Sequence, residues 1–87
     1  MADPNAVIGF RARNVLQYLA ECFVDEPENI EISTSQWRNR VSLSLSVAPD
    51  DMGKIIGRRG RTAQALRTLV RAAGALDQQD TFLDIVD

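Results

Sequence analysis

The sequence predicts a single α+β domain with the element order helix, strand, strand, helix, helix, strand. Apolar residues recur at three- and four-residue steps near the start of the chain and again over residues 61–73, which is the periodicity of amphipathic helices. Apolar residues instead alternate with serine over residues 41–47, which is the period of a strand. The 87 residues, 45% of them hydrophobic, suffice for one core and are too few for two domains.

The first helix is predicted to carry one apolar stripe and to end near Val24. The stripe consists of Ile8, Ala12, Val15, Leu16, Leu19 and Phe23. Pro27 follows closely, and proline disfavours helical geometry in the residue before it. Asp3 and Pro4 are typical of a helix start, but residues 1–10 fit an N-terminal extension equally well, with residues 11–87 as the domain.

Two strands follow as a predicted hairpin with one apolar and one polar face. Their apolar-face residues are Ile30, Ile32, Thr34, Val41, Leu43, Leu45 and Val47. A turn is expected around residues 37–39, where Trp37 has two interpretations. Its ring can stack on a base, or it can cover the sheet edge or a partner surface.

Two helices and a closing strand are predicted to complete the domain. Asp50 and Asp51 are interpreted as the cap of a short helix that ends at Gly57, rather than as catalytic carboxylates. The longer helix runs from about residue 61 to residue 73, with Gly74 as its carboxyl cap. Its expected packing residues are Ala63, Leu66, Leu69, Val70 and Ala73, and its expected polar face holds Arg61, Gln64, Arg67 and Arg71. The closing strand contains Phe82, Leu83, Ile85 and Val86.

Charge is unevenly distributed along the chain. Residues 48–74 hold six basic and two acidic residues, a net +4, whereas the remainder holds four basic and ten acidic residues, a net −6. A domain charged in this way can attract a polyanion to one face although its total charge is −2.

The functional prediction rests on the turn Gly57-Arg58-Arg59-Gly60 between the two helices. Glycines allow a ligand close to the backbone, the amino end of a helix presents amide protons, and arginine binds phosphate with paired hydrogen bonds. Lys54 and Arg61 add charge beside the turn. Ile55, Ile56 and part of Met52 are expected to form an apolar floor for unpaired bases. Further candidate RNA contacts are Gly53, Gln64 and Arg67.

The stretch Asp51-Met52-Gly53-Lys54-Ile55-Ile56-Gly57-Arg58-Arg59-Gly60-Arg61, with Ala63, Ala65 and Leu66, resembles the KhpA family of small bacterial single-KH-domain proteins. Val24-Asp25-Glu26-Pro27 and Val47-Ala48-Pro49-Asp50-Asp51 extend the resemblance to about residues 11–87. It implies a type II KH domain, α-β-β-α-α-β, whose three-stranded mixed sheet carries three helices on one face. Thr62 and Ala63 are smaller than the aliphatic residues usual there, which implies a shallower groove.

By this resemblance the loop clamps the backbone of about four unpaired nucleotides, and the chain acts as an RNA chaperone or post-transcriptional regulator. The alternative is a protein-interaction module, a homodimer or a heterodimer with a larger KH-containing protein of the KhpB type, with RNA binding secondary.

Other function classes are disfavoured. The chain has no histidine, one cysteine and no nucleophile beside an evident base, so no enzyme activity, metal, cofactor or small-molecule substrate is expected. No apolar run approaches the roughly 20 residues that span a bilayer, and a cytoplasmic location without membrane contact is expected. Cys22 is expected in the core or at its boundary.

Overall fold

The computed structural model describes residues 10–86 and contains the predicted elements in the predicted order. They are α2 (Phe10–Phe23), β1 (Glu31–Trp37), β2 (Arg40–Ser46), α3 (Met52–Ile56), α4 (Arg61–Leu76) and β3 (Asp80–Ile85). Short 3-10 turns are formed by Pro27–Asn29, Pro49–Asp51 and Arg58–Gly60. The α+β prediction and the type II KH fold are confirmed. The proposed helix start at Asp3 and Pro4, with the rest of residues 1–9, lies outside the described residues.

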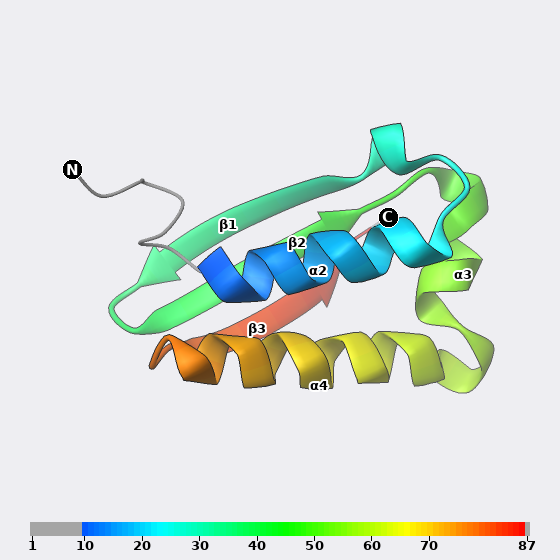
Figure 1. Cartoon of the computed structure of the whole chain (residues 1–87). Helices are drawn as coiled ribbons and strands as arrows, with labels where there is room; N and C mark the ends of the chain where they lie inside the picture. The colour runs from blue at the N-terminus through cyan, green and yellow to red at the C-terminus, as the bar shows by residue number, and fades with distance from the viewer. Residues whose placement is uncertain (1–9, 87) are drawn as a thin grey trace.

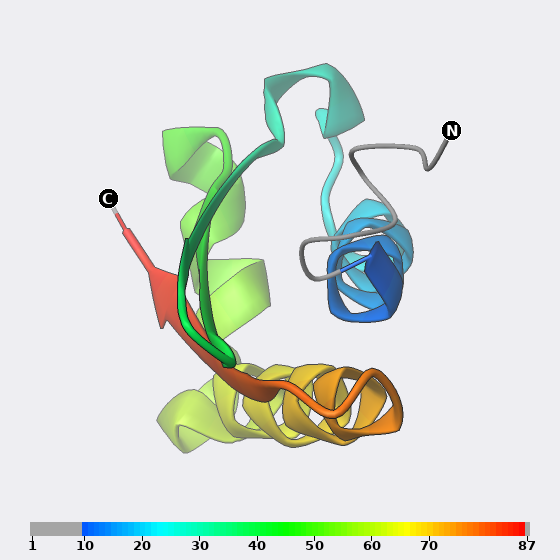
Figure 2. The same cartoon turned by 90° about the vertical axis from the view of Figure 1, so that its left-hand side faces the viewer.

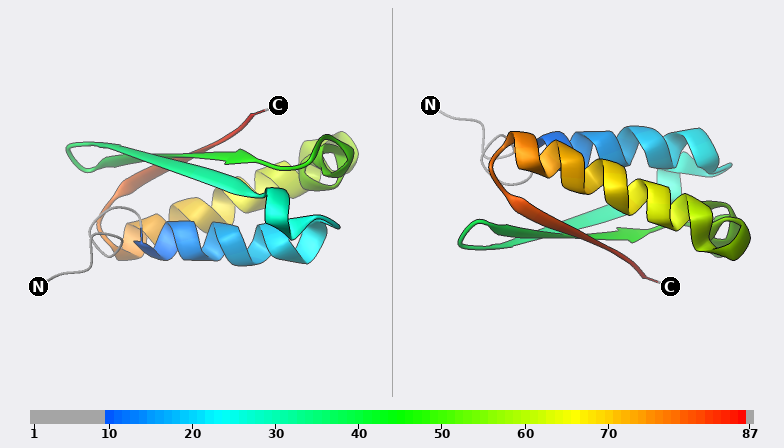
Figure 3. Two further views of the ribbon diagram at one scale, coloured as in Figure 1. Left: turned by 90° about the horizontal axis from the view of Figure 1, so that it is seen from above. Right: turned by 90° about the horizontal axis from the view of Figure 1, so that it is seen from below.

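The sheet is mixed, with the strand order β1-β2-β3. β1 pairs antiparallel with β2, and β2 pairs parallel with β3. Figures 1 and 2 show α2 and α4 running antiparallel to each other beside the sheet, and Figure 3 shows that both lie on the same face. α3 lies beyond the end of β2 and leads into α4 (Figure 1). Within residues 10–86 the other face of the sheet carries no helix.

The core lies between the sheet and the two long helices. Val41, Leu43 and Leu45 of β2 are wholly buried, because β2 is the central strand and its alternate side chains point at the helices. The helices contribute Ala12, Leu16, Ala20, Ile55, Leu66 and Val70 to the same cluster. Within residues 10–86, no helix combines the length and the apolar character needed to cross a membrane.

The buried stripe of α2 is narrower than the sequence predicts. Ala12, Leu16 and Ala20 are completely buried at four-residue spacing, whereas Phe23 is 41% exposed. Cys22 is exposed, so its expected place in the core is wrong. It lies about 200° around the helix from Ala20, on the side turned away from the sheet.

Gly74 is not the carboxyl cap of α4, which continues to Leu76. The residue is buried, and a β-carbon added there would lie 1.9 Å from Oγ1 of Thr81 in β3. Thr81 and Leu83 are the buried residues of β3, so Phe82 points to the open face of the sheet. Glycine at position 74 therefore allows the close approach of α4 and β3.

We expect Gly74→Ala to destabilise the protein by about 1–3 kcal/mol, the usual cost of overpacking a tight internal contact. Denaturant unfolding followed by circular dichroism measures the change. Gly53→Ala is the matched control, because nothing lies within 4 Å of a β-carbon added there. The control should leave stability unchanged or raise it by up to about 1 kcal/mol. Equal stability of the two variants would contradict the proposed packing.

Candidate nucleic-acid interface

The chain bends sharply at Gly57, between α3 and α4. Gly57 has φ 74° and ψ 175°, a conformation that side chains rarely allow. A β-carbon on Gly57 would also lie 2.2 Å from Oγ1 of Thr62, in the first turn of α4. Glycine is therefore required here both by the backbone and by the contact with Thr62.

The rest of the loop is held by its own backbone. Arg59 has φ 58° and ψ 25°, a left-handed conformation that costs a non-glycine residue about 1 kcal/mol or more. The amide of Gly60 donates to the carbonyl of Gly57 at 3.2 Å, and the amide of Arg61 donates to the carbonyl of Arg58. These two amides are not free for a ligand, contrary to the expectation for this helix end.

Three arginines around the bend are open to solvent. Arg58, Arg59 and Arg61 are exposed, and none of them forms an ion pair or side-chain hydrogen bond with another residue of the range 10–86. Their charges are not neutralised within that range and lie within four positions, on the turn and on the first residue of α4. A chain of phosphates can pair with several such charges at once.

Lys54 differs from the arginines because two carboxylates hold it. Its Nζ pairs with Oδ2 of Asp25 and lies 3.4 Å from Oδ1 of Asp51. Asp51 is buried, and its Oδ2 accepts the backbone amide of Glu26 at 3.0 Å. Asp51 occupies the N-cap position of α3, as expected, but its side chain makes no cap hydrogen bond. Instead it fastens the segment after α2 to the start of α3.

The contacts of Asp51 and Lys54 shift the pKa values of both side chains. Burial by itself would raise the pKa of Asp51, but the backbone amides of Asp25 and Glu26, together with Lys54, lower that pKa below its usual 3.8. The pKa of Lys54 is raised, mainly by its hydrogen bond to Asp25 and further by Asp51, against the opposing effect of desolvation. Asp51 and Lys54 are therefore both ionised at neutral pH.

The expected apolar floor is smaller than the sequence predicts. Ile55 is wholly buried in the core and presents no surface to a ligand. Ile56, by contrast, is 37% exposed, and Met52 is half-buried. In a helix of five residues, successive side chains point about 100° apart, so only one of the two isoleucines can face the core.

The candidate contacts on α4 and α3 have different surroundings. Gln64 and Gly53 are exposed. Arg67 is half-buried, and its Nε donates to the carbonyl of Leu83 in β3 at 3.4 Å. Arg67 thus links α4 to the edge strand β3, and its charge lies on the same helix as that of Arg61.

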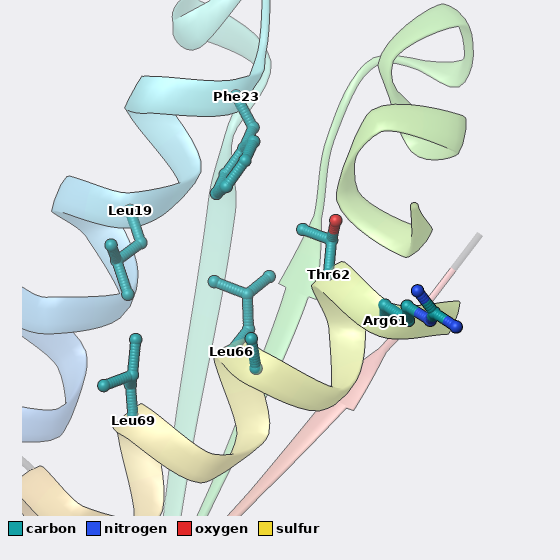
Figure 4. A pocket seen from close by; sticks show the side chains of 7 residues that line it. Leu19, Phe23, Arg61, Thr62, Leu66 and Leu69 are labelled. Atoms are coloured by element: carbon teal, nitrogen blue, oxygen red, sulfur yellow. The ribbon is translucent and has the colours of Figure 1, made fainter. Parts of the chain in front are cut away.

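A hollow of about 250 Å³ between α2 and α4 was missed by sequence reasoning. Its lining residues are Leu19, Phe23, Arg61, Thr62, Ala65, Leu66 and Leu69 (Figure 4). Leu69 is 48% exposed, which contradicts its expected packing. Phe23 and Leu69 lie at the margins of their apolar stripes, and this marginal position was the only sequence signal for the hollow.

Known proteins resemble this chain over most of its length. The family model described as KhpA/KhpB, KH domain matches residues 13–85. A relative from Halalkalibacterium halodurans, named RNA-binding protein KhpA, is 40% identical over 75 residues, or 86% of this chain and 99% of the relative. The protein of the same name from Streptomyces coelicolor is 42% identical over 72 residues, or 83% of this chain and 87% of the relative.

Solved structures show the same fold in a larger protein. The crystal structure of an Era variant from Aquifex aeolicus superposes with a TM-score of 0.60 at 15% sequence identity. The match covers 85% of this chain and 29% of the Era chain, and at this identity it concerns the fold alone.

We expect Asp51→Asn to lower the melting temperature at neutral pH, because it removes the charge that Lys54 pairs with while keeping an acceptor for Glu26. A carboxylate with a lowered folded-state pKa stabilises the protein above its unfolded-state value, and this contribution is lost as pH falls. The wild type should therefore lose more stability than the variant between about pH 5 and about pH 3.

Thermal unfolding followed by circular dichroism at a series of pH values tests this expectation. Asp50→Asn is the matched control, since Asp50 is exposed and adjacent in sequence. Parallel acid profiles for the wild type and Asp51→Asn would refute the stabilising role of the buried carboxylate.

Proposed function

The chain belongs to the KhpA/KhpB family of KH domains, and on that premise we propose that it binds single-stranded RNA through the loop Gly57-Arg58-Arg59-Gly60. The observation that carries the proposal is the set of three exposed arginines without internal partners at a glycine bend. Relatives named RNA-binding protein KhpA support RNA as the ligand. The family is not one of enzymes, in agreement with the sequence analysis.

The arginines act by pairing with consecutive phosphates. Arg58, Arg59 and Arg61 lie within four positions, so a backbone of about four unpaired nucleotides can cross them in one extended path. Lys54 contributes less, because Asp25 and Asp51 already share its charge. Backbone contacts position a strand without reading its sequence, so weak sequence selectivity is expected.

Bases of the same strand need an apolar surface beside the phosphates. Ile56, with part of Met52, supplies that surface next to the bend. Gly53, Gln64 and Arg67 remain candidate neighbours of the strand on α3 and α4. A duplex would keep its bases stacked and inaccessible, which favours single strands.

In the cell such a module holds RNA without changing it chemically. This corresponds to an RNA chaperone or post-transcriptional regulator that needs no cofactor, metal or small-molecule substrate. A cytoplasmic location stays a prediction, as does the division of the chain into residues 1–10 and a domain at 11–87.

Protein pairing is the second candidate function, as a homodimer or as a heterodimer with a larger KH-containing protein of the KhpB type. The observation in its favour is the apolar hollow between α2 and α4, beside which Phe23 and Leu69 are 41% and 48% exposed. Apolar side chains exposed around a concavity are typical of contact surfaces. The two surfaces share Arg61, which lines one end of the hollow, whereas Arg58 and Arg59 lie outside its lining.

We expect Arg59→Glu to weaken RNA binding at least about 10-fold, because a charge-assisted hydrogen bond is lost and a phosphate is repelled. Gly60→Asp should act in the same direction because it adds a negative charge to the loop; its β-carbon would meet nothing within 4 Å, and its φ of 73° adds only backbone strain. Gly57→Asp is less informative, because its side chain would collide with Thr62. Fluorescence anisotropy with a labelled single-stranded RNA measures the affinity.

Arg13→Glu is the charge-matched control, placed in the first half of α2 and far from the bend (Figure 1). Its affinity should stay within about 3-fold of the wild type, as expected for a distant charge screened by salt. Sedimentation of the same variants reports on self-association, with Leu69→Ser as the reciprocal variant at the hollow. Loop variants that keep RNA affinity but change the oligomeric state would favour the interaction module.

We also expect RNA affinity to fall as salt rises, because phosphate contacts release bound counterions. Each contact contributes a slope of about 0.7 in the plot of log affinity against log salt, so three arginines predict about 2. Arg59→Ala should reduce the slope by about 0.7. Titrations at four salt concentrations measure it, and a flat plot would exclude phosphate recognition as the main interaction.

A further inference from the structure

The open face of the sheet carries a group of side chains that the proposed function does not use. The group lies at the β1–β2 turn and consists of Trp37, Arg38, Arg40 and Phe82, which we call the hairpin patch. Trp37 is 71% exposed and Phe82 is 39% exposed. Large aromatic rings exposed together with arginines are uncommon on a surface that contacts only water.

The sheet register brings these residues to one face. Trp37 is directly opposite Arg40, and Phe82 of β3 is opposite Ser42 on the same side of β2. The guanidinium carbon of Arg40 lies 4.9 Å from the centre of the Phe82 ring. That of Arg38 lies 5.5 Å from the centre of the Trp37 ring. Each ring therefore has an arginine within cation–π distance.

The turn holds Arg38 in an unfavourable backbone conformation. Its φ is 59°, in the left-handed region where glycine or asparagine would be unstrained. A long basic side chain is strained in this conformation. Strain of this kind is often retained at binding sites, and here it accompanies a guanidinium beside Trp37.

The charge around the patch is positive at the hairpin and negative farther along the sheet. Arg38 and Arg40 form no ion pair with another residue of the range 10–86. Asp80 is the nearest acidic residue on this face, opposite Arg40 in the register. The other two, Glu31 and Asp84, lie opposite serines toward the far end of the strands.

We propose that the hairpin patch is a second contact for the RNA strand that the loop holds, with unpaired bases stacked on Trp37 and on the Arg40–Phe82 pair. Bases stack on aromatic rings and on guanidinium planes, and Arg38 and Arg40 can also pair with phosphates. This inference rests on the proposed function, because it extends the same strand to a second site.

RNA fits this face better than a protein partner. Apart from Trp37, Arg40 and Glu31, the open-face residues of β1 and β2 are serines, namely Ser33, Ser35, Ser42, Ser44 and Ser46. Serine is depleted in protein interfaces, whose centres are apolar. Hydroxyl groups, however, can bond to phosphate and ribose oxygens.

The two sites lie at opposite ends of the molecule. The β1–β2 turn and the loop between α3 and α4 are on opposite sides of Figure 1, and the longest dimension of the molecule is 39 Å. An RNA of about four nucleotides fills the loop alone. A longer strand can reach both sites, and the second contact then forms at high effective concentration.

Trp37 is the only tryptophan, so its fluorescence reports directly on the patch. A single-stranded RNA of about 12 nucleotides is within the site sizes of single-strand-binding domains. We expect it to quench the Trp37 fluorescence, with a titration curve that coincides with that of the RNA anisotropy. A labelled RNA of about four nucleotides should bind at the loop, which raises the anisotropy of the RNA, with little quenching of Trp37.

Trp37→Ala should weaken binding of the longer RNA by about 5- to 100-fold, the range found for loss of one base–aromatic stack. It should leave the short RNA unaffected, and Trp37→Phe should recover part of the loss because a ring remains. Tyr18→Ala is the control, since Tyr18 is 68% exposed on α2 and away from the sheet's open face. That variant should bind both RNAs as the wild type does.

Two failures can be told apart. If the wild-type protein does not raise the anisotropy of any labelled RNA, the proposed function fails. If the longer RNA binds and Arg59→Glu weakens it, but Trp37 fluorescence and Trp37→Ala affinity do not change, only the hairpin patch is refuted. A fluorescence change that depends on protein concentration and not on RNA would also overturn it, in favour of contact between copies.

Discussion

The close contact between Gly57 and Thr62 is the constraint on which the functional surface depends. Because Thr62 lies against the α-carbon of Gly57, the chain must leave α3 and enter α4 through a turn that only glycine can make. This turn projects Arg58 and Arg59 from the end of the molecule, away from the carboxylates that could neutralise them. A chain of net charge −2 can in this way present a cationic surface.

Lys54 shows how ion pairing separates charges that serve the fold from charges that are open to a ligand. Its ammonium group is drawn to Asp25 and to the buried Asp51, which also binds the amide of Glu26. These contacts tie the segment after α2 to α3 and so hold the base of the arginine loop in place. Of the four basic residues from position 54 to position 61, one is therefore committed to the fold and three are available to a ligand.

The same fold offers three surfaces that differ in chemistry. The loop is cationic, the hollow between α2 and α4 is apolar, and the open face of the sheet combines rings, arginines and serines. Parallel pairing of β2 with β3 requires α3 and α4 to cross between them, which covers one face of the sheet and leaves the other open. The open face is thus a consequence of topology and is available for contacts in this small domain.

The order of the elements, the arginine loop and the family can be predicted from the sequence, because helix and strand periodicity and the glycine turn are local signals. Which neighbours each side chain meets depends instead on the tertiary structure. Ile55 is buried while Ile56 is exposed, Lys54 pairs with Asp25 at a separation of 29 residues, and Gly74 serves the contact with Thr81 rather than a helix end. These outcomes depend on how distant segments pack, and packing leaves little trace in the spacing of residues along one element.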